Sequence, residues 1–114
     1  MRNRTRGTVL ATDCDVADSF FARAFGLIPR TELAIGEGLR LTHTSSITMW
    51  FMRFAIDVLF VDKAGKVVKI SERLAPWTAA IWALQASDVL ELPAGTARAT
   101  ATQVGDELVF ESVV

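Results

Sequence analysis

The fold of this chain is decided by the stretch WFMRFAIDVLFVDKAGKVVKIS, residues 50–71. Its two halves are rich in Val, Ile, Phe and Leu, and the segment DKAG, residues 62–65, separates them. Two β-prone runs joined by Asp-x-x-Gly predict a hairpin in which Gly65 takes the left-handed conformation of a bulged turn. The first run also contains Arg53 and Asp57, two charges inside an apolar segment.

Outside this hairpin, most of the chain has the pattern of short strands separated by turns. We expect strands within residues 7–12, 38–42, 46–54, 88–92, 96–104 and 107–114. Residues 73–86 combine many alanines with Pro76 and two tryptophans, which leaves a helix and an irregular cover over one end of the core as alternatives.

One helix is expected near the N-terminus. Residues 13–26, DCDVADSFFARAFG, place apolar side chains at helical spacing, and Asp13 or Asp15 can cap the start. The whole pattern predicts a mainly β chain: a compact sandwich or barrel with one short N-terminal helix. Residues 1–114 form a single domain in this interpretation, and residues 1–6 form a flexible basic arm.

Composition excludes several classes of function. Hydrophobic residues make up 51% of the 114 and the net charge is −1, so the chain can fold around one core and has no basic field for nucleic acid. Charges interrupt every long apolar run, so we expect no membrane span. A single cysteine fits a reducing compartment, and we therefore expect a cytoplasmic protein.

A family resemblance rests on motifs spread along the chain. They occupy residues 17–27, 36–39, 51–54, 56–57, 76–77, 90–95 and 105–106, together with Phe60, Asp62, Gly65 and Val67. Through them the sequence resembles domain-of-unknown-function family 192. The resemblance implies a compact β-rich, jelly-roll-like domain with a short helix, and it carries over no catalytic residue. Relatives usually have proline at the position of Ala55 and often a His-Thr pair where this chain has Thr48-Met49.

The embedded charges Arg53 and Asp57 have three interpretations. In an unbroken strand they would lie roughly 13 Å apart on one face, but the proline of relatives at position 55 predicts a kink near residues 54–56. As a structural clamp, Asp57 accepts backbone N–H groups or an arginine, while Arg53 binds a carboxylate such as Glu91. Alternatively, Arg53 binds an anionic ligand at the mouth of a pocket, or Asp57 is a general base.

The remaining candidate residues form no complete catalytic or metal-binding set. His43 is the only histidine and Cys14 the only cysteine, so neither a metal site nor a cofactor site is expected, and a Cys14–His43 pair requires the fold to join them. Trp50, Trp77 and Trp82 either pack in the core or offer an aromatic platform to a sugar or a peptide, with Trp77 the most exposed.

We therefore predict a small non-catalytic binding or accessory module, with an anion or small-ligand site formed by Trp50, Arg53, Asp57 and Trp77. The partner is a small ligand or a protein, and the chain is a monomer or a weak homodimer that pairs through residues 97–101. The alternative is a hydrolase-like enzyme that uses Asp57 or His43.

Overall fold

The structure is a computed structural model that describes residues 1–17, 30 and 32–110. Its elements are β1 (Arg2–Asn3), β2 (Thr8–Val9), β3 (Asp13–Ala17), β4 (Glu37–Leu41), β5 (Ser46–Ile47), β6 (Ile56–Val61), β7 (Val67–Leu74), β8 (Ile81–Trp82), β9 (Asp88–Pro93), α2 (Thr96–Ala99) and β10 (Leu108–Val109). The predicted mainly β class is therefore confirmed, with α2 as a short helix in the second half of the chain.

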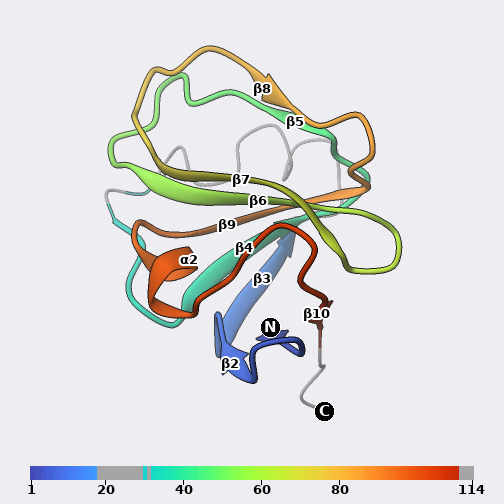
Figure 1. The fold of residues 1–114 in the computed structure, drawn as a ribbon. Coiled ribbons are helices and arrows are strands. Elements are labelled where there is room, and N and C mark those ends of the chain that lie inside the picture. The colour runs from blue at the N-terminus through green and yellow to red at the C-terminus, as the bar shows by residue number, and fades with distance from the viewer. Residues whose placement is uncertain (18–29, 31, 111–114) are drawn as a thin grey trace.

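A five-stranded sheet in the order β3-β4-β9-β6-β7 forms the middle of the molecule (Figure 1). Only the β3–β4 pair is parallel, and the other neighbours in this sheet are antiparallel. The short pair β5–β8 lies over one face, and α2 lies on the other side with the three-stranded sheet β10-β1-β2. The five-stranded sheet is open, with β3 and β7 at its edges, so the described strands do not close into a barrel.

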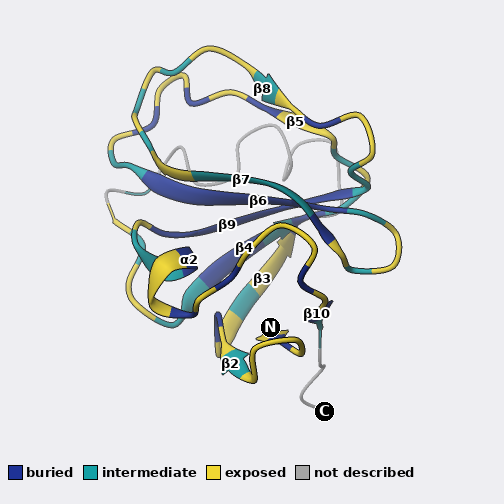
Figure 2. Ribbon diagram, viewed as in Figure 1, coloured by how far each residue is buried: buried dark blue, intermediate teal, exposed yellow. Residues whose placement is uncertain are grey.

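The two central strands, β6 and β9, are buried along their whole length (Figure 2). Their side chains alternate between two cores because successive residues of a strand point to opposite faces. On β6, Ile56, Val58 and Phe60 join the core beneath the β5–β8 layer, whereas Leu59 and Val61 join the core that contains Ala97 of α2. Asp57 has the parity of the second group, which turns its carboxylate toward α2.

The predicted hairpin is confirmed as β6–β7. Asp62 shapes its turn: Oδ1 accepts hydrogen bonds from the backbone N–H groups of Ala64 and Lys66, both at 2.9 Å. Gly65 has a φ of 82°, as expected for the left-handed position. A Cβ there would lie 2.6 Å from the Leu108 carbonyl oxygen, so the turn needs glycine for close approach as well as for conformation.

The predicted helix over residues 13–26 is wrong for its first five residues. Residues Asp13–Ala17 form β3, which pairs in parallel with β4 from Asp13↔Glu37 to Ala17↔Leu41. The apolar residues have helical spacing, but these residues form a strand because β4 provides partners for their backbone hydrogen bonds. The rest of that prediction lies outside the described residues.

The expectation of a single strand over residues 46–54 is also wrong. Only Ser46–Ile47 are extended and pair with β8, and the chain then turns at Met49–Met52, where the N–H of Met52 donates to the Met49 carbonyl at 3.2 Å. A run with apolar residues at both odd and even positions need not be a strand. Here Met49 and Met52 reach the core from a turn.

The alternating stretch 96–104 does not form a strand. Thr96–Ala99 are helical as α2, and turns follow, so the proposed sheet edge at residues 97–101 does not exist. The reason is tertiary: Gly95 takes a φ of 95°, and Asp57 binds the N–H groups at the start of α2. Residues 1–6, which we expected as a basic arm, include β1 and the fully buried Asn3.

Candidate functional site

The carboxylate of Asp57 is fully buried and saturated with hydrogen bonds. Oδ1 accepts the N–H of Arg73 at 2.9 Å, and Oδ2 accepts the N–H groups of Gly95 at 3.1 Å and Ala97 at 2.8 Å. These donors belong to β7, to the turn after β9 and to α2. This carboxylate therefore joins three parts of the fold. A general base must reach its substrate, and a fully buried carboxylate cannot do so.

Arg53 is exposed and makes no hydrogen bond or ion pair with the described part of the chain. It therefore pairs neither with Asp57 nor with Glu91. The structure separates the two charges that the sequence places together: the backbone between them bends at residues 54–55, β6 begins at Ile56, and only Asp57 enters the sheet. Arg53 is left as a cation beside the turn at Met49–Met52.

Two exposed turns lie side by side next to Arg53. The first is Met49–Met52, and the second is Ala75–Thr78, where the N–H of Thr78 donates to the Ala75 carbonyl at 3.3 Å. Two backbone hydrogen bonds join them: the N–H of Trp77 donates to the Met49 carbonyl at 2.7 Å, and the N–H of Met49 donates to the Thr78 carbonyl at 3.1 Å. Buried Met49 and Met52 anchor the pair of turns to the core.

Each turn places an aromatic residue at its third position with a positive φ. Phe51 has a φ of 65° and Trp77 one of 66°. Turns of this form favour glycine or asparagine there, because a bulky side chain in the left-handed region is strained. Pro76 at the second position fits the geometry of the second turn. No local sequence signal indicates that these two aromatic residues occupy positions that usually hold glycine.

The two rings meet at the surface. The ring centroids of Phe51 and Trp77 lie 4.9 Å apart with an interplanar angle of 56°, and the side chains are 62% and 60% exposed. Trp50 precedes Phe51 in the same turn and is 54% exposed. We call Trp50, Phe51 and Trp77 the aromatic patch. Of the four residues predicted for the site, Trp50 and Trp77 lie in these turns, Arg53 is exposed directly after the first turn, Asp57 is sealed in the interior, and Phe51 was missed.

His43 and Cys14 lie in different parts of the fold. His43 is exposed in the loop after β4, whereas Cys14 lies in β3 and packs at the edge of the core that contains Ala97. No hydrogen bond joins them; the Cys14 thiol donates to the Asp15 carbonyl at 3.6 Å. Burial raises the pKa of the Cys14 thiol, which disfavours the reactive thiolate. This geometry provides no nucleophile and base pair.

Glu91 is an unpartnered carboxyl group inside the protein. It lies on the central strand β9, between Leu39 of β4 and Val58 of β6, and its Oε2 atom has no hydrogen-bond partner. Burial raises the pKa of Glu91 to about 7. A neutral carboxyl group is far cheaper to bury than a carboxylate, so the fold holds Glu91 in its protonated form under mildly acidic conditions.

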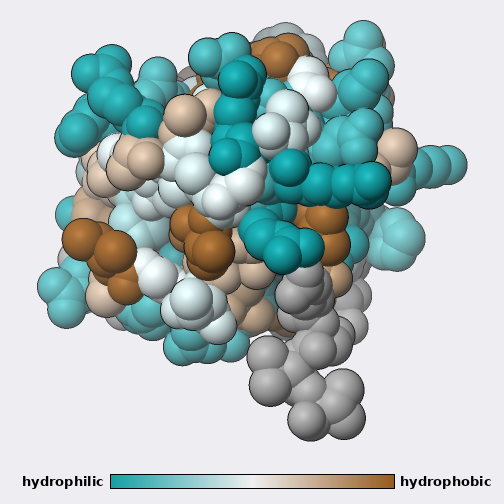
Figure 3. All heavy atoms as spheres, turned by 60° about the horizontal axis from the view of Figure 1, so that its bottom comes forward, coloured by the Kyte–Doolittle hydropathy of each residue, from teal (hydrophilic) through white to brown (hydrophobic). Residues whose placement is uncertain are grey.

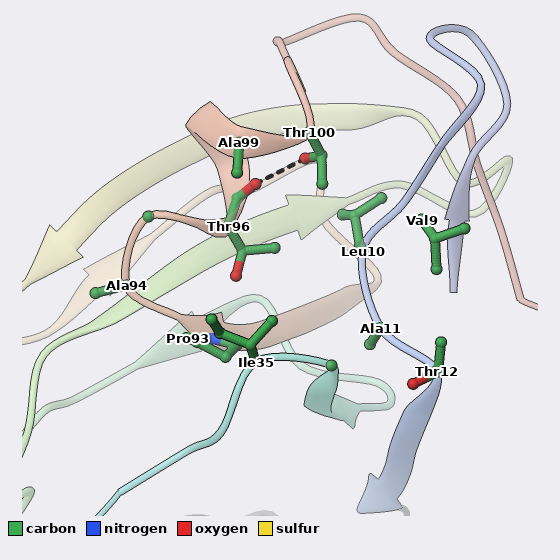
Figure 4. Close-up of a pocket in the computed structure, with 12 residues that line it drawn as sticks. Val9, Leu10, Ala11, Thr12, Ile35, Pro93, Ala94, Thr96, Ala99 and Thr100 are labelled. Carbon is green, nitrogen blue, oxygen red and sulfur yellow. Dashed lines mark hydrogen bonds between the residues drawn. The ribbon is translucent and has the colours of Figure 1, made fainter.

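An apolar groove of about 530 Å³ opens on the α2 side of the sheet. Ile35 and Pro93 lie on one side of it, Leu10 and Ala11 on another, and the Thr96 hydroxyl points toward Ile35 and Pro93 (Figure 4). On this face of the molecule, apolar side chains gather in separate groups among paler and hydrophilic residues (Figure 3). The groove has the size of a small-ligand site, but none of the described residues that line it is charged.

The described residues contain no cluster of three or more His, Cys, Asp or Glu side chains suited to a metal ion. Among the same residues, no helix has both the length and the apolar character needed to cross a bilayer.

Comparison with known proteins places the chain in a family. It is 33% identical over 113 residues to a UPF0127 protein of Thermococcus sibiricus, with 96% of this chain and 73% of the relative covered. It is 32% identical over 117 residues to a UPF0127 protein of Pyrococcus furiosus, with both chains covered completely. A crystal structure of a protein of unknown function from Novosphingobium aromaticivorans has a similar fold, with a TM-score of 0.79, 24% identity, and 85% and 74% of the two chains covered. The DUF192 family, described as "Uncharacterized ACR", matches residues 1–110, and the chain belongs to this family.

Proposed function

We propose that this protein is a non-catalytic binding module whose binding surface is the aromatic patch together with Arg53. The observation that carries the proposal is the conformation of Phe51 and Trp77, which both hold a positive φ in neighbouring turns while their rings meet in solvent. Backbone strain of this kind clusters at ligand sites, where the surrounding structure maintains it.

The contact between the two rings does not offset the backbone strain. A bulky residue in a sparsely populated backbone region costs about 1–3 kcal/mol, and a ring pair contributes about 0.5–1.5 kcal/mol. Both side chains are mostly exposed, so burial in the core does not offset the difference. Glycine would satisfy either turn at lower cost. Retention of two aromatic rings is explained if the rings contact a ligand.

Arg53 defines the chemistry of that ligand. An exposed guanidinium with no partner in the described residues suits a carboxylate or another oxyanion, which it can bind with two parallel hydrogen bonds. The neighbouring rings favour a flat apolar surface, such as the C–H face of a sugar ring. We therefore expect a ligand that carries both features, as an acidic saccharide does.

Titration of the intrinsic tryptophan fluorescence with oligouronates and with neutral oligosaccharides of the same length tests the proposal. We expect saturable binding of the acidic series, with the affinity lowered at least about tenfold by Trp77→Ala and by Arg53→Ala. Trp82→Ala is the matched aromatic control, because Trp82 is 59% exposed on β8, away from the start of β6 (Figure 1). Arg98→Ala is the matched cationic control, because Arg98 is exposed on α2. Equal affinities for all four variants would reject the aromatic patch.

Several properties of the protein belong to the same proposal. The β5–β8 layer over one face of the main sheet supports a jelly-roll-like sandwich. The small net charge and the single cysteine support a cytoplasmic protein that does not bind nucleic acid.

A further inference from the structure

A second cleft, with a volume of about 390 Å³, lies at the far end of β6 from the aromatic patch. It is lined by side chains of the β6–β7 turn, β4, the loops that flank β9 and the C-terminal part of the described chain, among them Arg40, His43, Lys63, Ser87, Asp88 and Phe110. Its lining mixes apolar with polar side chains and includes the cations Arg40 and Lys63, in contrast to the groove beside α2, where none of the described lining residues is charged.

The Arg40 side chain is fixed in this cleft before any ligand arrives. Its Nε donates to Oδ2 of Asp88 at 2.7 Å, and its guanidinium carbon lies 4.1 Å from the centroid of the Phe110 ring. Asp88 is itself held, because its Oδ1 accepts the backbone N–H of His43 at 3.3 Å. A guanidinium fixed along one edge and over one face loses little conformational freedom when it binds.

The remaining donors of Arg40 are free. Both Nη atoms lack a hydrogen-bond partner in the described part of the chain, and the side chain keeps 31% of its exposure. Lys63, on the β6–β7 turn, and the imidazole of His43 line the same cleft and likewise make no side-chain hydrogen bond or ion pair with the described residues.

The two acidic residues of the cleft, Asp62 and Asp88, accept hydrogen bonds from other parts of the fold. Both oxygen atoms of Asp88 are occupied by Arg40 and by the His43 N–H. Oδ1 of Asp62 accepts the N–H groups of Ala64 and Lys66 within its own turn. Oδ2 of Asp62 and the Ser87 hydroxyl have no hydrogen-bond partner among the described residues, so the cleft offers these two groups beside the donors of Arg40, Lys63 and His43.

We propose that this cleft is a binding site for a small oxyanion, a carboxylate or a phosphate group, received by the Nη atoms of Arg40 with Lys63 and His43 beside it. The site is independent of the aromatic patch. Arg40 supplies a fixed pair of donors, Asp88 positions Arg40, and Lys63 adds a mobile charge from the exposed turn.

The test is an NMR titration of the uniformly ¹⁵N-labelled protein with inorganic phosphate and, separately, with acetate at constant ionic strength. We expect saturable shifts of the backbone amides of Lys63, Ala64, Gly65 and Ser87 with at least one of the two anions, and a comparison of the two titrations shows which oxyanion is preferred. Arg40→Lys keeps the charge but loses the paired donors, so we expect about a tenfold weaker affinity. Lys63→Ala, on the exposed turn, is expected to weaken binding about threefold without loss of the fold.

Arg98→Ala is the control, because Arg98 is exposed on α2 and belongs to neither site, and it is expected to leave these shifts and affinities unchanged. Linear shifts without saturation, the same shifts with chloride, or affinities that neither Arg40→Lys nor Lys63→Ala changes would overturn the proposal. If Arg40→Lys fails to fold, the Lys63→Ala titration decides the question by itself. Because the aromatic patch is tested by saccharide binding, either site can fail without the other.

Discussion

The carboxylate of Asp57 accepts the backbone N–H of Ala97 at 2.8 Å, forty positions further along the chain. This contact makes a residue of the central strand β6 the hydrogen-bond acceptor for the start of α2, and Oδ1 of the same group holds Arg73 on β7. Arg73 has a φ of 49° and lies where the β6–β7 register shifts. One buried carboxylate thus fixes a bulge, a turn and a helix.

Asp57→Asn tests this role as a structural joint. An amide presents an N–H group toward at least one backbone donor, so a buried N–H loses its acceptor and the charge-assisted character of the bonds disappears. We expect the free energy of unfolding to fall by about 3 kcal/mol, measured by urea denaturation. The matched control is Asp62→Asn in a partly exposed turn, where both N–H groups donate to one oxygen, so the amide oxygen can still accept them and the cost should be at most about 1 kcal/mol. If both variants lost the same free energy of unfolding, Asp57 would not have the structural role proposed for it.

Glu91 makes the stability depend on pH. Its folded pKa, about 7, lies above the ordinary value of 4.5, so the folded state binds a proton more tightly than the unfolded chain does. The stabilisation is complete below about pH 4.5 and is lost as the pH rises through about 7, a change of about 3 kcal/mol. Glu91→Gln cannot ionise and should remove this contribution.

The measurement for Glu91 is the free energy of unfolding of the unmodified chain and of Glu91→Gln between pH 5 and pH 8. The difference between the two proteins isolates Glu91 from the other titrating groups, including Asp106, whose pKa is lowered by its bonds to Asn3 and Arg6 although burial opposes this. As the pH rises, we expect the free energy of unfolding of Glu91→Gln to increase relative to that of the unmodified chain. Parallel pH profiles would show that Glu91 ionises normally.

Trp77 tests the strain at the aromatic patch. Trp77→Ala and Trp77→Gly both remove the ring contact with Phe51, but only glycine adopts a φ of 66° without steric cost. We expect the glycine variant to be more stable than the alanine variant by about 1 kcal/mol in thermal or urea unfolding. Both variants should lose saccharide binding. An alanine variant as stable as the glycine variant would mean that the turn stores no strain.

Gly65 and Gly105 form a matched pair at the β6–β7 hairpin and the turn before β10. Both have a positive φ, but a Cβ at Gly65 would lie 2.6 Å from the Leu108 carbonyl oxygen, whereas a Cβ at Gly105 meets nothing within 4 Å. Gly105→Ala should cost about 1 kcal/mol from backbone strain alone. Gly65→Ala should cost at least about 2 kcal/mol more, because the backbone of β10 must move. A calorimetric scan of both variants gives the comparison.

The sequence by itself determined the hairpin that turns at residues 62–65 and the strand near residues 88–92. These follow from local chemistry: Asp62 and Gly65 specify the turn, and dense runs of β-prone apolar residues specify the strands. It also identified Trp50, Arg53 and Trp77 as candidates, since an exposed charge or a tryptophan beside proline in an apolar segment is unusual. The kink that the family resemblance predicts near residues 54–56 is confirmed by the bend before β6, but the prediction left open whether it would join Arg53 to Asp57 or separate them.

Only the tertiary structure decided the conformations of residues 13–17 and 96–99 and the composition of the two sites. Parallel pairing with β4 made a strand of Asp13–Ala17, and the buried carboxylate of Asp57 favoured a helix at Thr96–Ala99. The aromatic patch joins turns from distant parts of the chain, and the oxyanion cleft joins β4, the β6–β7 turn and Phe110. Periodicity reports which face of an element is apolar, but it does not report which distant backbone donors and acceptors that element will meet.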